Sequence, residues 1–148
     1  NRQVVGVFDN KLLKIFAIAL KNLNIKFAWI VNSEDGLDEI SPYAKTNIVQ
    51  LKNNEISEFT IDPDEINVNA EKFENLLGDD AKFNANKMID IFKGKDNDFS
   101  KAVCLNAAAG LIVSEKYSNF EEAYNNSRKH ILSGKSFKHL KSIQRPQS

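Results

Sequence analysis

Residues 3–31 read QVVGVFDNKLLKIFAIALKNLNIKFAWIV, and this stretch decides the fold. VVGVF at 4–8 and FAWIV at 27–31 are short apolar runs without alternation, which is typical of strands buried on both faces. The segment between them has the composition of a helix. A strand, a helix and a second strand over about thirty residues predict a βαβ unit, with parallel strands and a right-handed crossover.

The expected helix, KLLKIFAIALKNL, has an apolar stripe at the spacing i, i+4, i+8 and i+11. The stripe consists of Leu12, Phe16, Leu20 and Leu23. Lysines occupy the other face. Asp9 or Asn10 precedes the helix and is a candidate for its N-cap, because a short polar side chain there can accept a backbone hydrogen bond.

Beyond the βαβ unit the pattern changes to a hairpin and then to helices. NIVQLKNNEISEFTI at 47–61 contains two short runs joined at Asn53-Asn54, and Asn tolerates the positive φ of a tight turn. We predict helices at 70–77, 81–92 with an Asp cap, 100–115, 120–132 and 136–143, and a frayed tail, RPQS, at 145–148. The predicted fold class is α/β, with a mixed sheet packed by C-terminal helices.

The bulk composition limits the possible functions. The chain has 148 residues, enough for one domain with a hydrophobic core. Lys+Arg and Asp+Glu both number 20, which argues against a dominant surface for nucleic acid. The single cysteine, Cys104, allows no intrachain disulfide, and no apolar stretch has the ~20 residues that span a bilayer. With no basic and apolar leader before the first strand, we expect a soluble cytoplasmic protein.

An acidic turn, VNSEDGLDEIS at 31–41, follows the second strand. It carries four carboxylates: Glu34, Asp35, Asp38 and Glu39. In open α/β sheets, ligands bind beyond the carboxyl ends of parallel strands. The adjacent Asp38 and Glu39 could serve two metal ions, or one ion and its water shell, and hard oxygen ligands suit Mg²⁺. The alternative is an ordinary solvated acidic loop.

Six stretches, in order along nearly the whole chain, resemble the catalytic domain of anthranilate phosphoribosyltransferases. They are QVVGVF, DGLDEIS, PDEINV, LLGDDAKFNA, AVCLNAAAGLIV and FEEAYNNSRKHILSGKSFKHLKSI. DGLDEIS is the most specific of them. The resemblance implies a partial catalytic domain of the nucleoside phosphorylase and phosphoribosyltransferase type. Residues 1–148 would be its C-terminal portion, with the glycine-rich loop and the N-terminal helical domain absent.

The resemblance also implies a reaction. The full-length protein would transfer the phosphoribosyl group from phosphoribosyl pyrophosphate to anthranilate, in tryptophan biosynthesis, and would form a homodimer through the absent N-terminal domain. Asp38 and Glu39 match the family's Asp-Glu pair, which binds the Mg²⁺ ions that accompany phosphoribosyl pyrophosphate. No catalytic residue or anthranilate contact is expected within this chain, and the chain alone should be inactive.

Two departures from the family pattern are visible in the sequence. Asn32-Ser33 stands where the family commonly has His-Gly, and Asp79 stands where a second glycine is usual. Two alternative functions remain: a non-catalytic paralogue that binds nucleic acid, and a pyrimidine nucleoside phosphorylase. The acidic turn and the balanced charge disfavour the first, and DGLDEIS fits the second less well.

The other chemically interesting residues have structural interpretations. Nothing near Cys104 would lower its pKa, so a buried structural thiol is favoured over a nucleophile. The small residues from Asn106 to Ala109 indicate close helix packing. Asp79 and Asp80 could form a second acidic site, although helix capping explains at least one of them. Trp29 is expected in the core, and His130 and His139 in surface or packing roles. Lysines 129, 135, 138 and 141 are expected on a solvated helix face.

Overall fold

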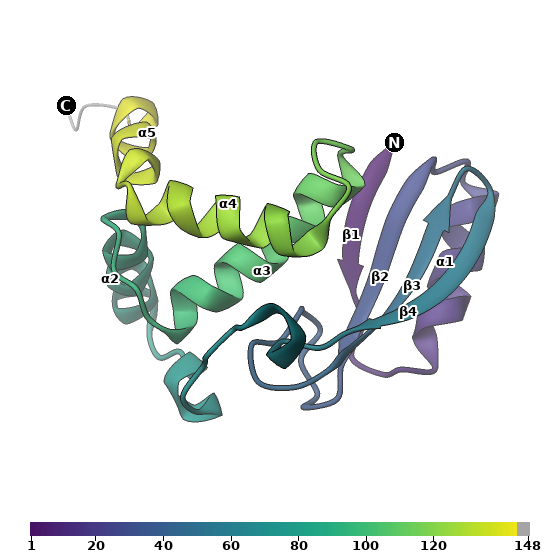
Figure 1. Cartoon of the computed structure of the whole chain (residues 1–148), viewed down its shortest axis with the longest axis horizontal. Coiled ribbons are helices and arrows are strands. Elements are labelled where there is room, and N and C mark those ends of the chain that lie inside the picture. Colours follow the sequence, from purple (N-terminus) through teal and green to yellow (C-terminus); the bar gives the residue numbers. More distant parts are fainter. Residues whose placement is uncertain (145–148) are drawn as a thin grey trace.

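A computed structural model of the chain describes residues 1–144 and contains a four-stranded sheet in the order β1-β2-β3-β4 (Figure 1). The strands are β1 (Arg2–Gly6), β2 (Phe27–Ser33), β3 (Thr46–Lys52) and β4 (Glu55–Ile61). β1 pairs with β2 in parallel, and the other two pairs are antiparallel. The mixed sheet predicted from the βαβ unit and the hairpin is therefore confirmed. The tail at 145–148, which was expected to fray, lies outside the described residues.

β2 is buried along its whole length because helices cover both faces of the sheet. Its side chains alternate between two cores, as the period of two in a strand requires. Ala28 and Ile30 pack in the core beneath α1. Trp29 and Val31 pack in the larger core, which α3 and α4 complete. Burial on both faces explains why FAWIV is continuously apolar.

The helix between the first two strands, α1 (Leu12–Asn22), buries a different stripe from the one predicted. Its buried residues are Leu13, Ala17 and Leu20. Of the predicted stripe, Leu20 is buried as expected, but Phe16 is 38% exposed and Leu23 is 70% exposed. The helix is rotated by about one residue because the spacing i, i+4, i+7 places Leu13 and Ala17 against the sheet.

The predicted N-cap of α1 was also wrong. The N-cap position is Lys11, which makes no capping hydrogen bond through its side chain. Asp9 acts just before the helix: its Oδ1 accepts a hydrogen bond from the backbone N–H of Lys11 at 2.9 Å. This is an Asx turn, in which an Asp side chain binds the backbone two residues on. Asp9 therefore shapes the connection from β1 without capping the helix itself.

The hairpin between β3 and β4 turns at Asn53 and Asn54, as predicted. Both residues have positive φ, 48° and 70°, which asparagine accommodates better than most residues. The helix predicted at 70–77 is absent, and only the short 3₁₀ helix η2 (Phe73–Leu76) forms, after η1 (Asp64–Ile66). Lys72 is extended, with φ −161° and ψ 148°, because the backbone N–H of Glu71 binds Asp98 instead of entering a helix.

Four helices complete the chain: α2 (Ala81–Phe92), α3 (Asp98–Val113), α4 (Phe120–Leu132) and α5 (Lys135–Ile143). Asp80 caps α2, as predicted, by accepting a hydrogen bond from the N–H of Phe83 at 2.7 Å. α3 begins two residues before its predicted start, because Asn97 and Ser100 form a capping box. Figure 1 shows α3 and α4 side by side next to the β1 edge of the sheet, with α2 and α5 farther out.

Candidate functional site

The acidic loop, residues 34–41, follows the carboxyl end of β2 and lies beside the carboxyl end of β1. Asn32 joins the two strand ends, because its Nδ2 donates a hydrogen bond to the carbonyl oxygen of Val7 at 2.8 Å. Gly36 has a φ of 91°, which lets the loop reverse its direction. The loop thus occupies the edge where α/β sheets bind ligands.

The four carboxylates of the loop are not equivalent, and Asp35 holds the loop together. Its Oδ2 accepts a hydrogen bond from Ser41 Oγ at 2.5 Å, and its Oδ1 accepts one from the N–H of Leu37 at 3.3 Å. Ser41 is fully buried, and its own N–H donates to Thr46 Oγ1 at 3.1 Å. Both carboxylate oxygens of Asp35 therefore stabilise the loop conformation.

Asp38 and Glu39 are exposed and uncommitted. Within residues 1–144, no group donates a hydrogen bond to either carboxylate and none forms an ion pair with it. The described part of the chain also contains no cluster of three or more His, Cys, Asp or Glu side chains that could hold a metal. Mg²⁺ needs only one or two protein carboxylates when waters and substrate phosphates complete its octahedron. The Asp38 and Glu39 pair fits that kind of open site.

Gly6, the last residue of β1, sets the position of Asp38. A Cβ on Gly6 would lie 1.6 Å from the carbonyl oxygen of Asp38 and 2.7 Å from its carbonyl carbon. No side chain fits in this space, since the contact is with backbone. The sequence marks Gly6 only as part of an apolar strand, so this close approach was not predicted.

Asn106 on α3 binds the acidic loop directly. Its Oδ1 accepts a hydrogen bond from the N–H of Ile40 at 2.9 Å, and its Nδ2 donates to the Ile40 carbonyl oxygen at 3.1 Å. The sequence interpretation placed Asn106 in a small-residue packing face. Ala108 and Ala109 are buried, as that interpretation expects, but Ala107 is exposed and Asn106 has this second role. An amide within an apolar helix was the available signal, because a buried amide needs partners.

Asp98, in the first turn of α3, is the centre of a second group of hydrogen bonds. The residue is 3% exposed. Its Oδ2 accepts hydrogen bonds from the Tyr43 hydroxyl at 3.0 Å, the Glu71 N–H at 3.1 Å and Asn75 Nδ2 at 2.8 Å. Its Oδ1 accepts one from Lys101 Nζ at 3.0 Å. Asp98 therefore joins the segment after the acidic loop to η2 and α3.

The surroundings of Asp98 control its ionisation. Burial alone would raise the pKa of the carboxyl group, but hydrogen bonds from Asn75, Lys101, the Glu71 N–H and Tyr43 outweigh burial, so its pKa lies well below the usual range. Burial, together with the hydrogen bond to Asp98, raises the pKa of Tyr43 above its ordinary value. Asp98 is thus a fixed anion and Tyr43 a neutral donor.

The remaining candidates from the sequence have structural roles. Cys104 is fully buried, and burial raises the pKa of its thiol to about 11, so the prediction of a structural thiol is confirmed. Trp29 is buried, with its Nε1 donating to Gln50 Oε1 at 3.0 Å. His130 and His139 are exposed. None of the described helices combines the length and the apolar character needed to cross a membrane.

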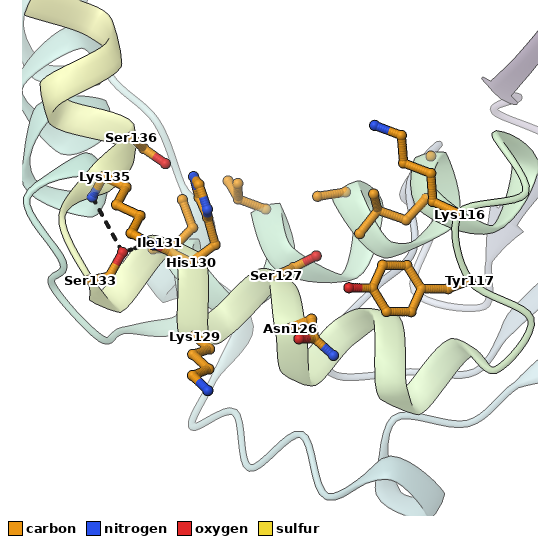
Figure 2. Close-up of a pocket in the computed structure, with 14 residues that line it drawn as sticks. Lys116, Tyr117, Asn126, Ser127, Lys129, His130, Ile131, Ser133, Lys135 and Ser136 are labelled. Atoms are coloured by element: carbon orange, nitrogen blue, oxygen red, sulfur yellow. Dashed lines mark hydrogen bonds between the residues drawn. The ribbon is translucent and has the colours of Figure 1, made fainter.

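A groove with a volume of about 830 Å³ lies elsewhere, between α3, α4 and α5. Figure 2 shows the rings of Tyr117 and His130 along it, with Ser127 between them. No residue of the acidic loop lines this groove. The exposed carboxylates of the loop therefore lie outside this groove.

Known proteins similar to this chain bear the name of the family that the sequence resembles. Anthranilate phosphoribosyltransferase from Pelagibacter ubique (strain HTCC1062) is 77% identical over 144 residues, which cover 97% of this chain and 44% of that protein. The enzyme of the same name from Rhodopseudomonas palustris (strain BisB5) is 37% identical over 133 residues, covering 90% and 39%. The chain spans less than half the length of these relatives.

Solved structures support the fold. Anthranilate phosphoribosyltransferase from Thermus thermophilus superposes with a TM-score of 0.81 at 25% identity, over 93% of this chain and 40% of that one. The Saccharomyces cerevisiae enzyme in complex with PRPP and Mg gives a TM-score of 0.83 at 22% identity, over 95% and 41%. The predicted α/β fold class is therefore confirmed. The resemblance found in the sequence is confirmed by the 77% identity to the Pelagibacter ubique enzyme.

A family model described as "Glycosyl transferase family, a/b domain" matches residues 1–137. That match includes both parallel strands, the acidic loop, and the helices α3 and α4 that complete the core behind it. The protein chain therefore belongs to the glycosyl transferase family.

Proposed function

We propose that this chain is the C-terminal part of an anthranilate phosphoribosyltransferase, and that Asp38 and Glu39 are its Mg²⁺ ligands. One observation carries the site proposal: the two carboxylates are exposed, and have no partner within residues 1–144, on a loop that Gly6 and Asn106 hold in place. Two such oxygen ligands suit an ion that also binds waters and substrate phosphates. The 77% identity to a relative of that name supports the assignment of the reaction.

The complete protein would join anthranilate to the ribosyl group of phosphoribosyl pyrophosphate. The amine of anthranilate attacks the anomeric carbon, the bond from that carbon to the pyrophosphate oxygen breaks, and pyrophosphate leaves with the electron pair. The attacking nitrogen then releases one proton to solvent. Mg²⁺, when bound, stabilises the negative charge that builds on the leaving group. Asp38 and Glu39 hold the charge that binds the ion, and the reaction requires no nucleophilic side chain from this chain.

The other parts of the active site belong, on this proposal, to the rest of a longer protein. Residues 1–148 would be the C-terminal portion of the catalytic domain. The glycine-rich loop for pyrophosphate, the anthranilate contacts and the helical domain through which the protein forms a homodimer would lie upstream. Such a biosynthetic enzyme would act in the cytoplasm. The alternative of a nucleic-acid-binding paralogue has no support from the balanced charge or from the relatives.

The test uses the longer protein that contains this chain. The double substitution Asp38→Ala, Glu39→Ala should lower kcat/KM for phosphoribosyl pyrophosphate at least ~100-fold, with the Mg²⁺ dependence lost, because a few kcal/mol of charge stabilisation is removed. Asp79→Ala is the matched control, since Asp79 is also exposed but lies outside the loop. Undiminished turnover in the double variant would refute the metal role. Turnover by residues 1–148 alone would refute the division of the active site.

A further inference from the structure

We infer that Asn106 is a positioning residue for the proposed metal site, which it serves by fixing the backbone that carries Asp38 and Glu39. The inference rests on the proposed function, since it assigns Asn106 to the same site. Asn106 does not belong to the loop. It lies 66 residues farther along the chain than Ile40, on α3.

The contact is bidentate. Asn106 uses its amide oxygen for the Ile40 N–H, at 2.9 Å, and its amide nitrogen for the Ile40 carbonyl oxygen, at 3.1 Å. Two bonds to the two backbone groups of one residue restrict rotation as well as translation of that residue. A third bond, from Nδ2 to the carbonyl oxygen of Ala102 at 3.0 Å, fixes the amide on its own helix.

The helix behind Asn106 is rigidly placed. Leu105, Ala108 and Ala109 are fully buried in the larger core, on either side of Asn106 in the sequence. Ile40 is itself buried in the same core, next to the exposed Glu39. A site held by a packed helix is more precise than a site held by a loop alone.

Gly6 limits the same segment at a second residue, Asp38. The Asp38 carbonyl occupies the space in which a Cβ of Gly6 would lie. Residues 38–40 are therefore confined between the end of β1 and the middle of α3. Of the loop carboxylates, only Asp38 and Glu39 lie within this confined segment, whereas Glu34 and Asp35 precede it.

This confinement has a consequence for metal binding. A mobile pair of carboxylates loses conformational freedom when an ion binds, at a cost for each side chain and peptide that becomes ordered. Asn106 orders the backbone before the ion arrives. Removing its amide should therefore weaken metal binding without removing any ligand.

The experiment titrates the longer protein that contains this chain with Mn²⁺, alone and with inorganic pyrophosphate, and measures free Mn²⁺ by electron paramagnetic resonance. Asn106→Ala should raise the dissociation constant about five- to tenfold, the equivalent of one or two lost hydrogen bonds. Asn126→Ala is the matched control. Asn126 Nδ2 donates to the carbonyl oxygen of Glu122 at 2.9 Å, like Asn106 to Ala102, but does not touch the acidic loop. The control should change the constant by less than about twofold, since it removes no contact with the loop.

Two further variants keep the test decisive. Asn106→Leu preserves the side-chain volume and replaces Asn106→Ala if that variant does not fold. Asp38→Ala, Glu39→Ala reports on the ligands themselves. In each folded variant, faster amide hydrogen exchange at Ile40 shows that its N–H has lost its partner. A general loss of stability would instead speed exchange over the whole core.

The outcomes separate the two proposals. Loss of Mn²⁺ binding in the double variant, with unchanged affinity in both Asn106 variants, overturns the positioning role and leaves the proposed function intact. Unchanged affinity in the double variant overturns the metal role of the loop, and the positioning role with it. No saturable Mn²⁺ binding by the unsubstituted longer protein, even with pyrophosphate, overturns both. Weaker binding in the double variant and in the Asn106 variants, but not in Asn126→Ala, supports both proposals.

Discussion

The side-chain amide of Asn106 binds both backbone groups of Ile40, accepting from its N–H at 2.9 Å and donating to its carbonyl oxygen at 3.1 Å. This pair connects the central helix of the larger core to the acidic loop. The two carboxylates before Ile40 are exposed, while Ser41 is buried, and Asp35 and Asn106, which hold the loop, are half-buried. Stability and metal binding should therefore depend on different residues of one short loop.

Substitutions within the acidic loop should separate those two properties. Asp35→Ala should lower the free energy of unfolding by about 1–3 kcal/mol, because the buried Ser41 hydroxyl loses its acceptor. Asp38→Ala and Glu39→Ala should each change it by less than about 0.5 kcal/mol, since both side chains are exposed and have no partner among the described residues. Urea unfolding of the three variants measures the difference. An equal loss of stability in all three would contradict this division of roles.

Gly6 should tolerate no side chain. Gly6→Ala should lower the free energy of unfolding by about 1–3 kcal/mol and shift the amide resonances of residues 38–40, because the new methyl group meets the Asp38 carbonyl. Gly110→Ala is the control, since a Cβ there has nothing within 4 Å. That change should be neutral or should stabilise α3 by up to about 1 kcal/mol. Unchanged loop resonances in Gly6→Ala would show that the close approach is not required.

Asp98 should make stability depend on pH in the acid range. Its folded-state pKa is lowered from the ordinary 3.8, so the carboxylate form stabilises the fold. That contribution is complete above about pH 5 and is lost as the pH falls below 3.8 towards the folded-state pKa. Asp98→Asn should cost about 2–4 kcal/mol at pH 7, and the difference from the unsubstituted chain should shrink in acid.

Urea unfolding between about pH 7 and about pH 2 checks this prediction, with Asp79→Asn as the exposed control. The control should follow the unsubstituted chain at every pH. A constant difference between Asp98→Asn and the unsubstituted chain over this range would mean that Asp98 does not titrate as its contacts require.

Cys104 should react only when the chain unfolds. It is fully buried, and its pKa of about 11 leaves little thiolate at about pH 8. The rate of modification by Ellman's reagent should therefore follow the unfolding equilibrium and rise with urea. A fast reaction in native buffer, independent of urea, would contradict the burial of the thiol.

The local chemistry of the sequence predicted those elements whose signals lie within a few residues. Asn53 and Asn54 indicated the hairpin turn, since asparagine accepts the positive φ that the turn needs. Asp80 indicated the start of α2, because its side chain caps an N–H only three residues away. The continuous apolar run in β2 indicated a strand covered on both faces. The acidic turn indicated the location of the candidate site at the carboxyl end of that strand.

Features that depend on distant partners were missed. The helix predicted at 70–77 is lost because the Glu71 N–H binds Asp98, 27 residues away. The periodicity of α1 allowed two apolar stripes, and packing against the sheet selected the one with Leu13 and Ala17.

By itself, the sequence determined the parallel strand pair, the hairpin, the C-terminal helices and the acidic turn that follows β2. Only the tertiary structure decided which carboxylate of that turn holds the loop through hydrogen bonds and which two are exposed. Asp35 is bound to Ser41 within the loop, whereas Asp38 and Glu39 are held in place by Gly6 and Asn106, which come from β1 and α3. Periodicity and turn chemistry act over a few residues, while hydrogen bonds and steric limits act between any groups that folding brings together.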